Sequence, residues 1–269
     1  MWEPSHRCNR VLGLPILRVL ALMVLAGALA GCATVHSRPP RLLPTLSENG
    51  KPPVIVMGFV GFLDRPDDIR LSVVQLGERL RETYPTGVYV EVFQNREKAK
   101  ARRVIHQLLD VDQDGGLSSH EKRQADIILY GHSWGGGTVV SLARALHKDD
   151  IPVSLTVQVD SIHKLLRNDA KIPPNVAEAA NFYQPHGFFH GRHQIYAVDP
   201  GQTRILGNYR FEYEKNSVHC PPSFSWYEMY FARSHIEMDC DPKVWAEVEA
   251  LIRHHLPAPP RSEEESERR

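Results

Sequence analysis

The chain has 269 residues, of which 42% are hydrophobic and 24% are charged. This length can bury a sizeable core, and 18 glycines and 20 prolines are too few for a collagen-like or low-complexity chain. Lysine plus arginine and aspartate plus glutamate both total 32, so the sequence lacks the positive charge of a general nucleic-acid binder. We therefore expect a globular protein with no nucleic-acid partner.

The N-terminus carries basic residues followed by an apolar run. Arg7, Arg10 and Arg18 precede an unbroken apolar stretch from Val19 to Ala30. A membrane-spanning helix needs about 20 such residues, so this shorter run indicates a signal peptide rather than a permanent anchor. We expect residues 1–31 to be removed on export.

The apolar run ends in Leu29-Ala30-Gly31-Cys32. Small residues directly before a cysteine resemble the bacterial lipobox, and this resemblance implies cleavage before Cys32 and diacylation of its thiol. Two acyl chains are enough for stable membrane attachment. Because Ala33 follows rather than aspartate, the resemblance favours the outer membrane of the cell envelope over the inner one. A plain secretory signal, giving a secreted protein, is the alternative.

Polar, proline-bearing segments flank the region that is expected to be globular. Residues 32–52 predict a tether and residues 257–269 predict a disordered tail, because neither has a periodic apolar face. Residues 53–256 contain no repeat of solenoid length. We expect this region to form one domain.

Short β-rich runs alternate with helical patterns along this domain. The predicted strands are 53–57, 87–93, 127–130, 153–159 and 194–198. Four helices are predicted. The first begins near Asp67 and Asp68, the second covers 96–109, the third starts at Thr138, and the fourth follows Asp241 with Pro242 in its first turn. Such alternation predicts an α/β fold with a mostly parallel sheet flanked by helices.

Residues 110–121 carry oxygen-bearing side chains at the spacing of a calcium-binding loop. They resemble the EF-hand loop, with glycine at the sixth position of the motif. The ligands that this resemblance implies are Asp110, Asp112, Asp114, the Gly116 carbonyl, Ser118 and Glu121. The next predicted strand follows closely, so we expect one structural Ca²⁺ ion rather than a paired EF-hand domain. An acidic loop without calcium is the alternative.

The strand at 127–130 leads into Gly131-His132-Ser133-Trp134-Gly135, and a helical stretch follows. This G-x-S-x-G pattern between a strand and a helix is typical of a tight turn that exposes a nucleophilic serine. In this pattern the chain resembles the α/β-hydrolase superfamily over residues 53–256. The resemblance implies that fold with Ser133 as the nucleophile; a glycine-rich turn with an inert serine is the alternative.

A serine nucleophile needs an imidazole to accept its proton and a carboxylate to orient that imidazole. The resemblance places the histidine after the last strand and before the last helix, which favours His235, with His219 second. Asp160 and Asp199 both end predicted strands, and periodicity does not separate them. Most members of the superfamily favour the position of Asp199, whereas the Val-Asp-Ser stretch at 159–161 resembles thioesterase-like members. Because that resemblance is local and specific, we predict Asp160 as the triad acid, with Asp199 as the alternative.

The resemblance also implies two amide donors for the oxyanion. One is the N–H of Trp134, and the other is expected from Phe59 in the glycine-bearing stretch 57–61, where a mere tight turn is the alternative. The aromatic-rich segment 161–192 falls where this superfamily inserts a cap, so it is expected either to line a pocket or to pack in the core.

Cys220 and Cys240 are the two thiols that remain after removal of the signal and lipidation of Cys32. In an oxidising compartment they can form a disulfide that closes a loop of about twenty residues and stabilises the fold by roughly 3 kcal/mol. Two free, buried thiols are the alternative.

Together these patterns predict an envelope-anchored serine hydrolase of the carboxylesterase or lipase type, acting on a small-molecule or lipid ester. A catalytically inactive calcium-binding lipoprotein, using the fold for binding or scaffolding, is the alternative in a different functional class. A peptidase on the same fold is a third possibility.

Overall fold

The computed structural model describes residues 51–162, 168–220, 224 and 226–260, which belong to one compact unit, Leu43–Arg269. The predicted signal peptide, the predicted lipidation site Cys32, nearly all of the predicted tether and most of the predicted tail lie outside the described residues. No helix among those described is long and apolar enough to cross a membrane.

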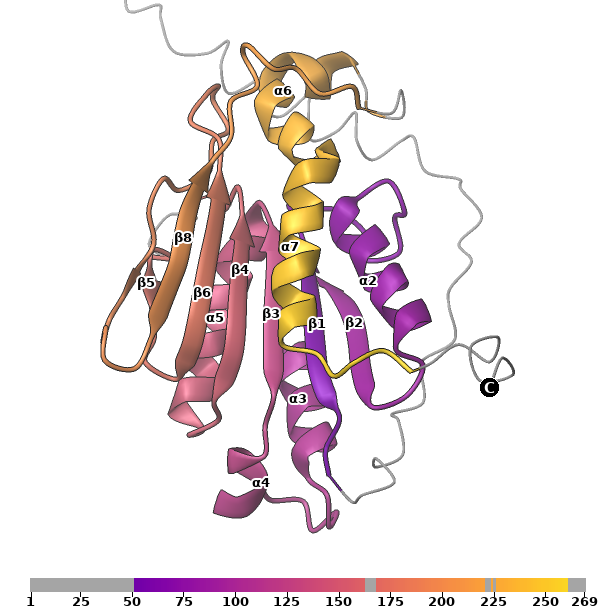
Figure 1. Cartoon of the computed structure of the whole chain (residues 1–269), viewed down its shortest axis with the longest axis vertical. Helices are drawn as coiled ribbons and strands as arrows, with labels where there is room; N and C mark the ends of the chain where they lie inside the picture. Colours follow the sequence, from indigo (N-terminus) through magenta and orange to yellow (C-terminus); the bar gives the residue numbers. More distant parts are fainter. Residues whose placement is uncertain (1–50, 163–167, 221–223, 225, 261–269) are drawn as a thin grey trace, which may run out of the picture. The chain divides into compact units, whose positions relative to one another are not determined.

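A six-stranded sheet forms the centre of this unit (Figure 1). In spatial order its strands are β2 Val88–Gln94, β1 Val54–Val60, β3 Ile127–His132, β4 Val153–Val159, β6 Val176–Tyr183 and β8 Arg204–Arg210. All neighbouring pairs are parallel, so the six carboxyl ends meet at one edge. The chain runs outward from β1 to β2 and returns to β3 on the other side of β1, which makes the switch point where open α/β sheets bind ligands. The predicted α/β fold, with a mostly parallel sheet flanked by helices, is confirmed.

Helices cover both faces of the sheet, with α2 and α7 on one side and α3 and α5 on the other (Figure 1). The helices are α2 Ser72–Thr83, α3 Lys98–Leu109, α4 Ser119–Arg123, α5 Trp134–Lys148, α6 Trp226–Cys240 and α7 Pro242–His254. Successive side chains of β1 alternate between the two cores, Val56 facing one and Ile55 and Met57 the other. A strand that is buried on both faces has a continuous apolar sequence, which explains why β1 was recognisable in the sequence.

The second half of the sheet differs from the prediction. The predicted strand 194–198 is reduced to the two-residue β7 (Tyr196–Ala197), which pairs with β5 (Lys171–Ile172) outside the main sheet. The position beside β4 belongs to β6, and β8 follows β6 at the edge of the sheet; neither strand was predicted. Glu178 and Asn181 interrupt the apolar run of β6, and β8 is a half-exposed edge strand, so neither gives a strong apolar signal.

The predicted cap segment 161–192 is also corrected, because it contains β6 and therefore returns to the sheet. Phe182 on this strand is fully buried in the core. Phe188 and Phe189, in the loop after β6, are exposed. One part of the segment, with Phe182, thus packs in the core, whereas another part, with Phe188 and Phe189, lies exposed at the rim of the sheet.

Two boundaries at the start of the domain shift as well. β1 extends to Val60 rather than ending at 57, and α2 begins at Ser72. Asp67 and Asp68 precede the helix and pair with the neighbouring arginines Arg65 and Arg70 in the loop. The loop that faces the carboxyl edge of the sheet therefore begins at Gly61.

Candidate active site

Ser133 lies on the sharp turn between β3 and α5, at the carboxyl edge of the sheet. Its backbone has φ 56° and ψ −126°, a conformation that residues other than glycine rarely adopt. The Ser133 N–H donates to the Val159 carbonyl over 2.9 Å, which fixes the turn against β4. A Cβ on Gly135 would overlap the Phe59 carbonyl oxygen, so the glycine after the serine is required by close packing. The predicted serine turn is therefore present.

Asp160 directly follows β4 and is completely buried. Its Oδ2 lies 2.6 Å from His235 Nδ1, and the His235 side chain is 12% exposed. The carboxylate also accepts hydrogen bonds from the Gly191 N–H over 2.6 Å and from Gln184 Nε2 over 2.9 Å. A carboxylate held in this way fixes the orientation and tautomer of the imidazole.

His235 comes from α6 rather than from the loop that was predicted to carry it. The helix is kinked at Ala232, where φ is −131°, and the histidine follows one turn later. Cys220 and Cys240 form a disulfide with a Cα–Cα distance of 5.5 Å, so the segment that bears the histidine is closed by a covalent cross-link. The bridged form of the two thiols is the one observed.

Ser133 and His235 line one cavity of about 310 Å³. Most of the remaining wall is aromatic or aliphatic. These residues are Phe62, Leu71, Trp134, Ile162, Phe189, Phe224, Ala232 and Ile236. Asp64, His132 and Asp239 add polar atoms. The serine and the histidine therefore open onto an enclosure of the size and polarity that a small apolar group would occupy.

Two further titratable groups lie beneath the His235 ring. His132 stacks on it with a centroid distance of 4.5 Å, and His132 Nδ1 lies 3.6 Å from Asp239 Oδ1. Burial, together with the neighbouring His235 ring, lowers the pKa of His132 well below its ordinary value. Burial also raises the pKa of Asp239 to about 7, with Asp64 adding repulsion. Both groups are thus disfavoured in their charged forms.

The two predicted oxyanion donors have different surroundings. Trp134 begins α5, so its N–H belongs to the first helical turn, where backbone donors point out of the helix. Phe59 lies inside β1 with strands on both sides, so its amide belongs to the sheet rather than to a loop. The prediction for Phe59 fails because β1 is longer than its apolar pattern indicated.

Gly61 and Phe62 occupy the place expected of Phe59. A Cβ on Gly61 would lie 3.2 Å from Ser133 Cβ, so this backbone passes next to the serine. The carbonyls of Gly61 and Phe62 both accept hydrogen bonds from the side-chain amide of Asn95. In a trans peptide the following N–H points the opposite way, so the Phe62 N–H is directed away from Asn95.

The alternative triad residues are not brought to this site. Asp199 lies in an exposed turn, where its carboxylate accepts from the Gly201 N–H and from the Gln202 side chain. His219 lines a different surface hollow beside Cys220. Asp199 forms a turn, which is a common role for aspartate.

Three of the predicted calcium ligands converge. Carboxylate oxygens of Asp110, Asp112 and Asp114 lie within 4.8 Å of one another, and Gly115 has φ 86°, the left-handed turn that the motif requires. Asp110 Oδ1 is buried and has no hydrogen-bond partner among the described residues. A hard cation would satisfy this orphaned oxygen, so the first half of the loop fits Ca²⁺.

Glu121 does not join this group. Its carboxylate accepts from the N–H groups of Val111 and Ser118, each over 2.8 Å, and from Ser118 Oγ. The Ser118 hydrogen bonds come first among the contacts that hold the pKa of Glu121 below its usual value. Ser118 and Glu121 form a capping box on α4, a use that the ligand spacing did not indicate.

Several residues around the triad were not identified from the sequence. His132 is the variable residue of G-x-S-x-G, so its position next to the nucleophile was readable, although its stacking on His235 was not. Asp239, Gln184 and Gly191 lie in no recognisable motif, and their contacts depend on tertiary structure.

Comparison with known proteins adds little to this description. No protein-family model matches the chain, and no curated protein matches its sequence. Among solved structures the chain is similar to RedJ, a thioesterase from the prodiginine biosynthetic pathway of Streptomyces coelicolor. The two share 11% sequence identity with a TM-score of 0.35, over 83% of this chain and 98% of the RedJ chain.

Proposed function

We propose that this protein is a serine hydrolase that cleaves an ester by acyl transfer. The observation that carries the proposal is the 2.6 Å contact between His235 and the buried Asp160, with His235 and Ser133 opening onto the same cavity. In this scheme Ser133 Oγ attacks the substrate carbonyl, and His235 accepts its proton and later returns it to the leaving alcohol. Water then releases the acyl group from Ser133 by the same route.

Asp160 keeps the proton of neutral His235 on Nδ1, which leaves Nε2 to accept the proton of Ser133. Its buried charge also stabilises the imidazolium that forms during the attack. For the oxyanion we propose the N–H groups of Trp134 and Phe62, since the former begins α5 and the latter points away from Asn95. The N-terminus of α5 adds the positive end of the helix dipole.

The cavity lining supports an apolar acyl or aromatic group in the substrate. Its aromatic and aliphatic walls suit the carbon chain of a small-molecule or lipid ester, and a volume of about 310 Å³ suits a short one. We further propose Ca²⁺ at Asp110, Asp112 and Asp114, and attachment to the cell envelope through a diacylated Cys32. The calcium proposal draws on the convergence of the three carboxylates. The anchoring proposal draws on the sequence before Cys32.

Labelling with a fluorophosphonate probe tests the proposal, because this reagent forms a covalent bond with an activated serine. We expect the full-length chain, purified in detergent, to be labelled and Ser133→Ala to be unlabelled. Asp160→Asn should slow labelling by on the order of 10⁴-fold, since loss of a triad acid has an effect of that size.

Asp199→Asn is the matched control, because it removes the competing carboxylate from an exposed turn and should leave the labelling rate unchanged. A folded, calcium-loaded chain that is not labelled would contradict the hydrolase proposal. That outcome would favour the second candidate, a catalytically inactive calcium-binding lipoprotein.

A further inference from the structure

Asp160 depends on the loop after β6 for much of its hydrogen bonding. The Gly191 N–H donates to Oδ1 over 2.6 Å, and Gln184 donates to Oδ2 through Nε2 over 2.9 Å. A Cβ on Gly191 would overlap Asp160 Oδ1, so the loop backbone lies directly against the carboxylate. Since Asp160 is completely buried, water cannot replace these donors. The position of this loop therefore determines how the triad acid is held.

The loop from Gln184 to Ile195 contains neither helix nor strand, so side-chain contacts must hold it in place. Arg192, the neighbour of Gly191, makes two of them and one backbone hydrogen bond besides. Its N–H donates to the Ser161 carbonyl over 3.0 Å, and its carbonyl accepts from Asn181 Nδ2 over 2.8 Å. Its side chain donates through Nε to Asp169 Oδ1 over 2.5 Å.

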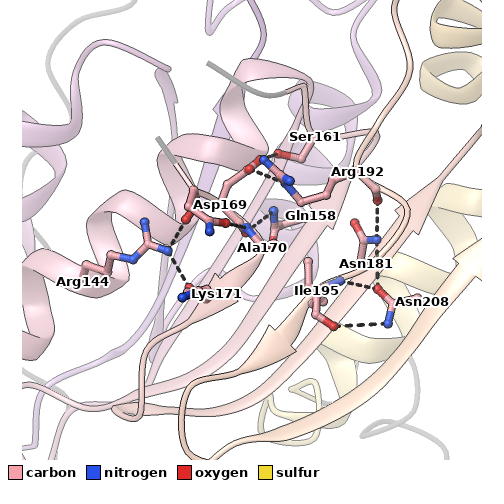
Figure 2. Close-up of polar contacts among 11 residues, drawn as sticks. Arg144, Gln158, Ser161, Asp169, Ala170, Lys171, Asn181, Arg192, Ile195 and Asn208 are labelled. Carbon is pink, nitrogen blue, oxygen red and sulfur yellow. Dashed lines mark hydrogen bonds and ion pairs between the residues drawn. The ribbon is translucent and has the colours of Figure 1, made fainter. Parts of the chain in front are cut away.

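Asp169 joins this loop to the segment that carries the triad acid (Figure 2). It is 3% exposed, and its second carboxylate oxygen accepts from Ser161 Oγ over 2.6 Å. Ser161 directly follows Asp160 in the chain. The Asp169 carbonyl also accepts from the buried side chain of Gln158 on β4 over 3.3 Å. Arg192 and Asp160 are thus connected through one buried carboxylate that is itself fixed to the sheet.

The energetics of burial make this connection sensitive to substitution. Breaking an ion pair by removing one partner leaves the buried charge of the other uncompensated, which destabilises the surrounding structure. Here the destabilisation would affect the loop whose Gly191 and Gln184 donate hydrogen bonds to the triad acid. Removing a residue that holds a functional side chain in place, without itself contacting the substrate, typically lowers the function of the site by about 10–100-fold.

We propose that Arg192 and Asp169 are positioning residues for the triad acid. The ion pair between the half-buried Arg192 side chain and the buried Asp169 carboxylate holds the loop so that Gly191 and Gln184 donate to Asp160. Asp160 in turn presents Oδ2 to His235. The effect on catalysis rests on the proposed hydrolase function. The effect on the contact between Asp160 and His235 can be measured without it.

The test compares Arg192→Gln and Asp169→Asn with wild type in the full-length chain. The first readout is the far-downfield proton NMR signal of an imidazole N–H shared with a buried carboxylate, assigned to His235 by its absence in His235→Gln. We expect both variants to lose or broaden this signal while circular dichroism shows a folded chain. The second readout is the fluorophosphonate labelling rate, which should fall by about 10–100-fold.

Arg204→Gln is the matched control, because it removes an arginine from an exposed pair with Glu178 at the amino end of β8. It should change neither readout. If Arg192→Gln does not fold, Arg192→Lys serves in its place: it keeps the charge, loses the planar guanidinium, and should weaken both readouts partly.

A wild-type signal and labelling rate in the folded Arg192 and Asp169 variants would overturn the inference. A merely structural role would lower the melting temperature of these variants without affecting the signal, and that result also counts against it. If wild type shows the signal but is not labelled, the proposed function fails, while loss of the signal in the variants still supports the positioning role.

Discussion

Single side chains near Ser133 show how burial, rather than residue type, determines charge. Asp239 and His132 are both almost fully buried, and each is disfavoured in its charged form. Their 3.6 Å separation is therefore not a strong ion pair, because burial disfavours the charged form of each partner. Asp160 is the carboxylate in direct contact with His235, so an imidazolium that forms there is stabilised first by that group.

The raised pKa of Asp239 gives a prediction for stability against pH. An acid that ionises near pH 4 when unfolded and at about 7 when folded destabilises the fold increasingly across that interval. Asp239→Asn cannot ionise. The melting temperature of the variant minus that of wild type should therefore rise between about pH 4 and 7 and then stay constant.

Thermal melts followed by circular dichroism in a pH series measure this difference. His132 titrates in both chains, so its contribution largely cancels in the subtraction. Asp150→Asn is the control, because Asp150 is exposed and asparagine tolerates its positive φ of 58°. A difference between Asp239→Asn and wild type that is the same at every pH would show that Asp239 ionises normally.

At the scale of elements, the predictable parts were those with a local signal. The serine turn between β3 and α5 has its own glycine spacing. Helix α7 has Asp241 as its N-cap, which accepts from the Lys243 N–H, and Pro242 at its first position. β6 and β8 could not be found, because small or polar residues interrupt one and the other lies at the sheet edge. The choice of Asp160 over Asp199 also had a local signal, the Val-Asp-Ser stretch at 159–161, and the contact of Asp160 with His235 agrees with it.

The loop between α3 and α4 gives a prediction at this scale. Three carboxylates within 4.8 Å repel one another unless a cation lies among them. We expect excess Ca²⁺ to raise the melting temperature relative to chelated protein, and a calcium concentration 100 times the Kd would stabilise the fold by about 2.7 kcal/mol.

Titration calorimetry with CaCl₂ on the chelated chain, together with thermal melts, measures this effect. Asp112→Asn should weaken calcium binding, whereas Asp150→Asn removes an acid outside the loop and should preserve it. Identical melting curves with calcium and with chelator would rule out a structural calcium ion here.

At the scale of the whole molecule, the described domain is one part of a chain whose first fifty residues lie outside the described region. Their sequence carries the expected export and lipidation signals, and no described helix can cross a membrane. From the sequence before Cys32 we propose that a lipid on this cysteine attaches the protein to the membrane. A tether of about 20 residues would span at most ~70 Å when fully extended.

Fractionation of a bacterial host that expresses the full chain tests this assignment. We expect wild type in the membrane fraction, with a diacylglyceryl group on its N-terminal cysteine by mass spectrometry. Cys32→Ala should lose the lipid and the membrane association, whereas Cys8→Ala, in the expected signal peptide, should behave as wild type. Membrane association of unlipidated Cys32→Ala would contradict the lipid anchor.

The disulfide between Cys220 and Cys240 links this export route to the assembly of the site. Disulfides form and persist in oxidising compartments, and a loop of about twenty residues gains roughly 3 kcal/mol from closure. In a reducing cytosol the same chain would carry Ser133 and Asp160 in place, but the segment bearing His235 would be held by noncovalent contacts alone. Under the proposed export, oxidation after translocation would then add the last constraint on the histidine, and the site of newly made protein would be least well assembled before the chain leaves the cytosol.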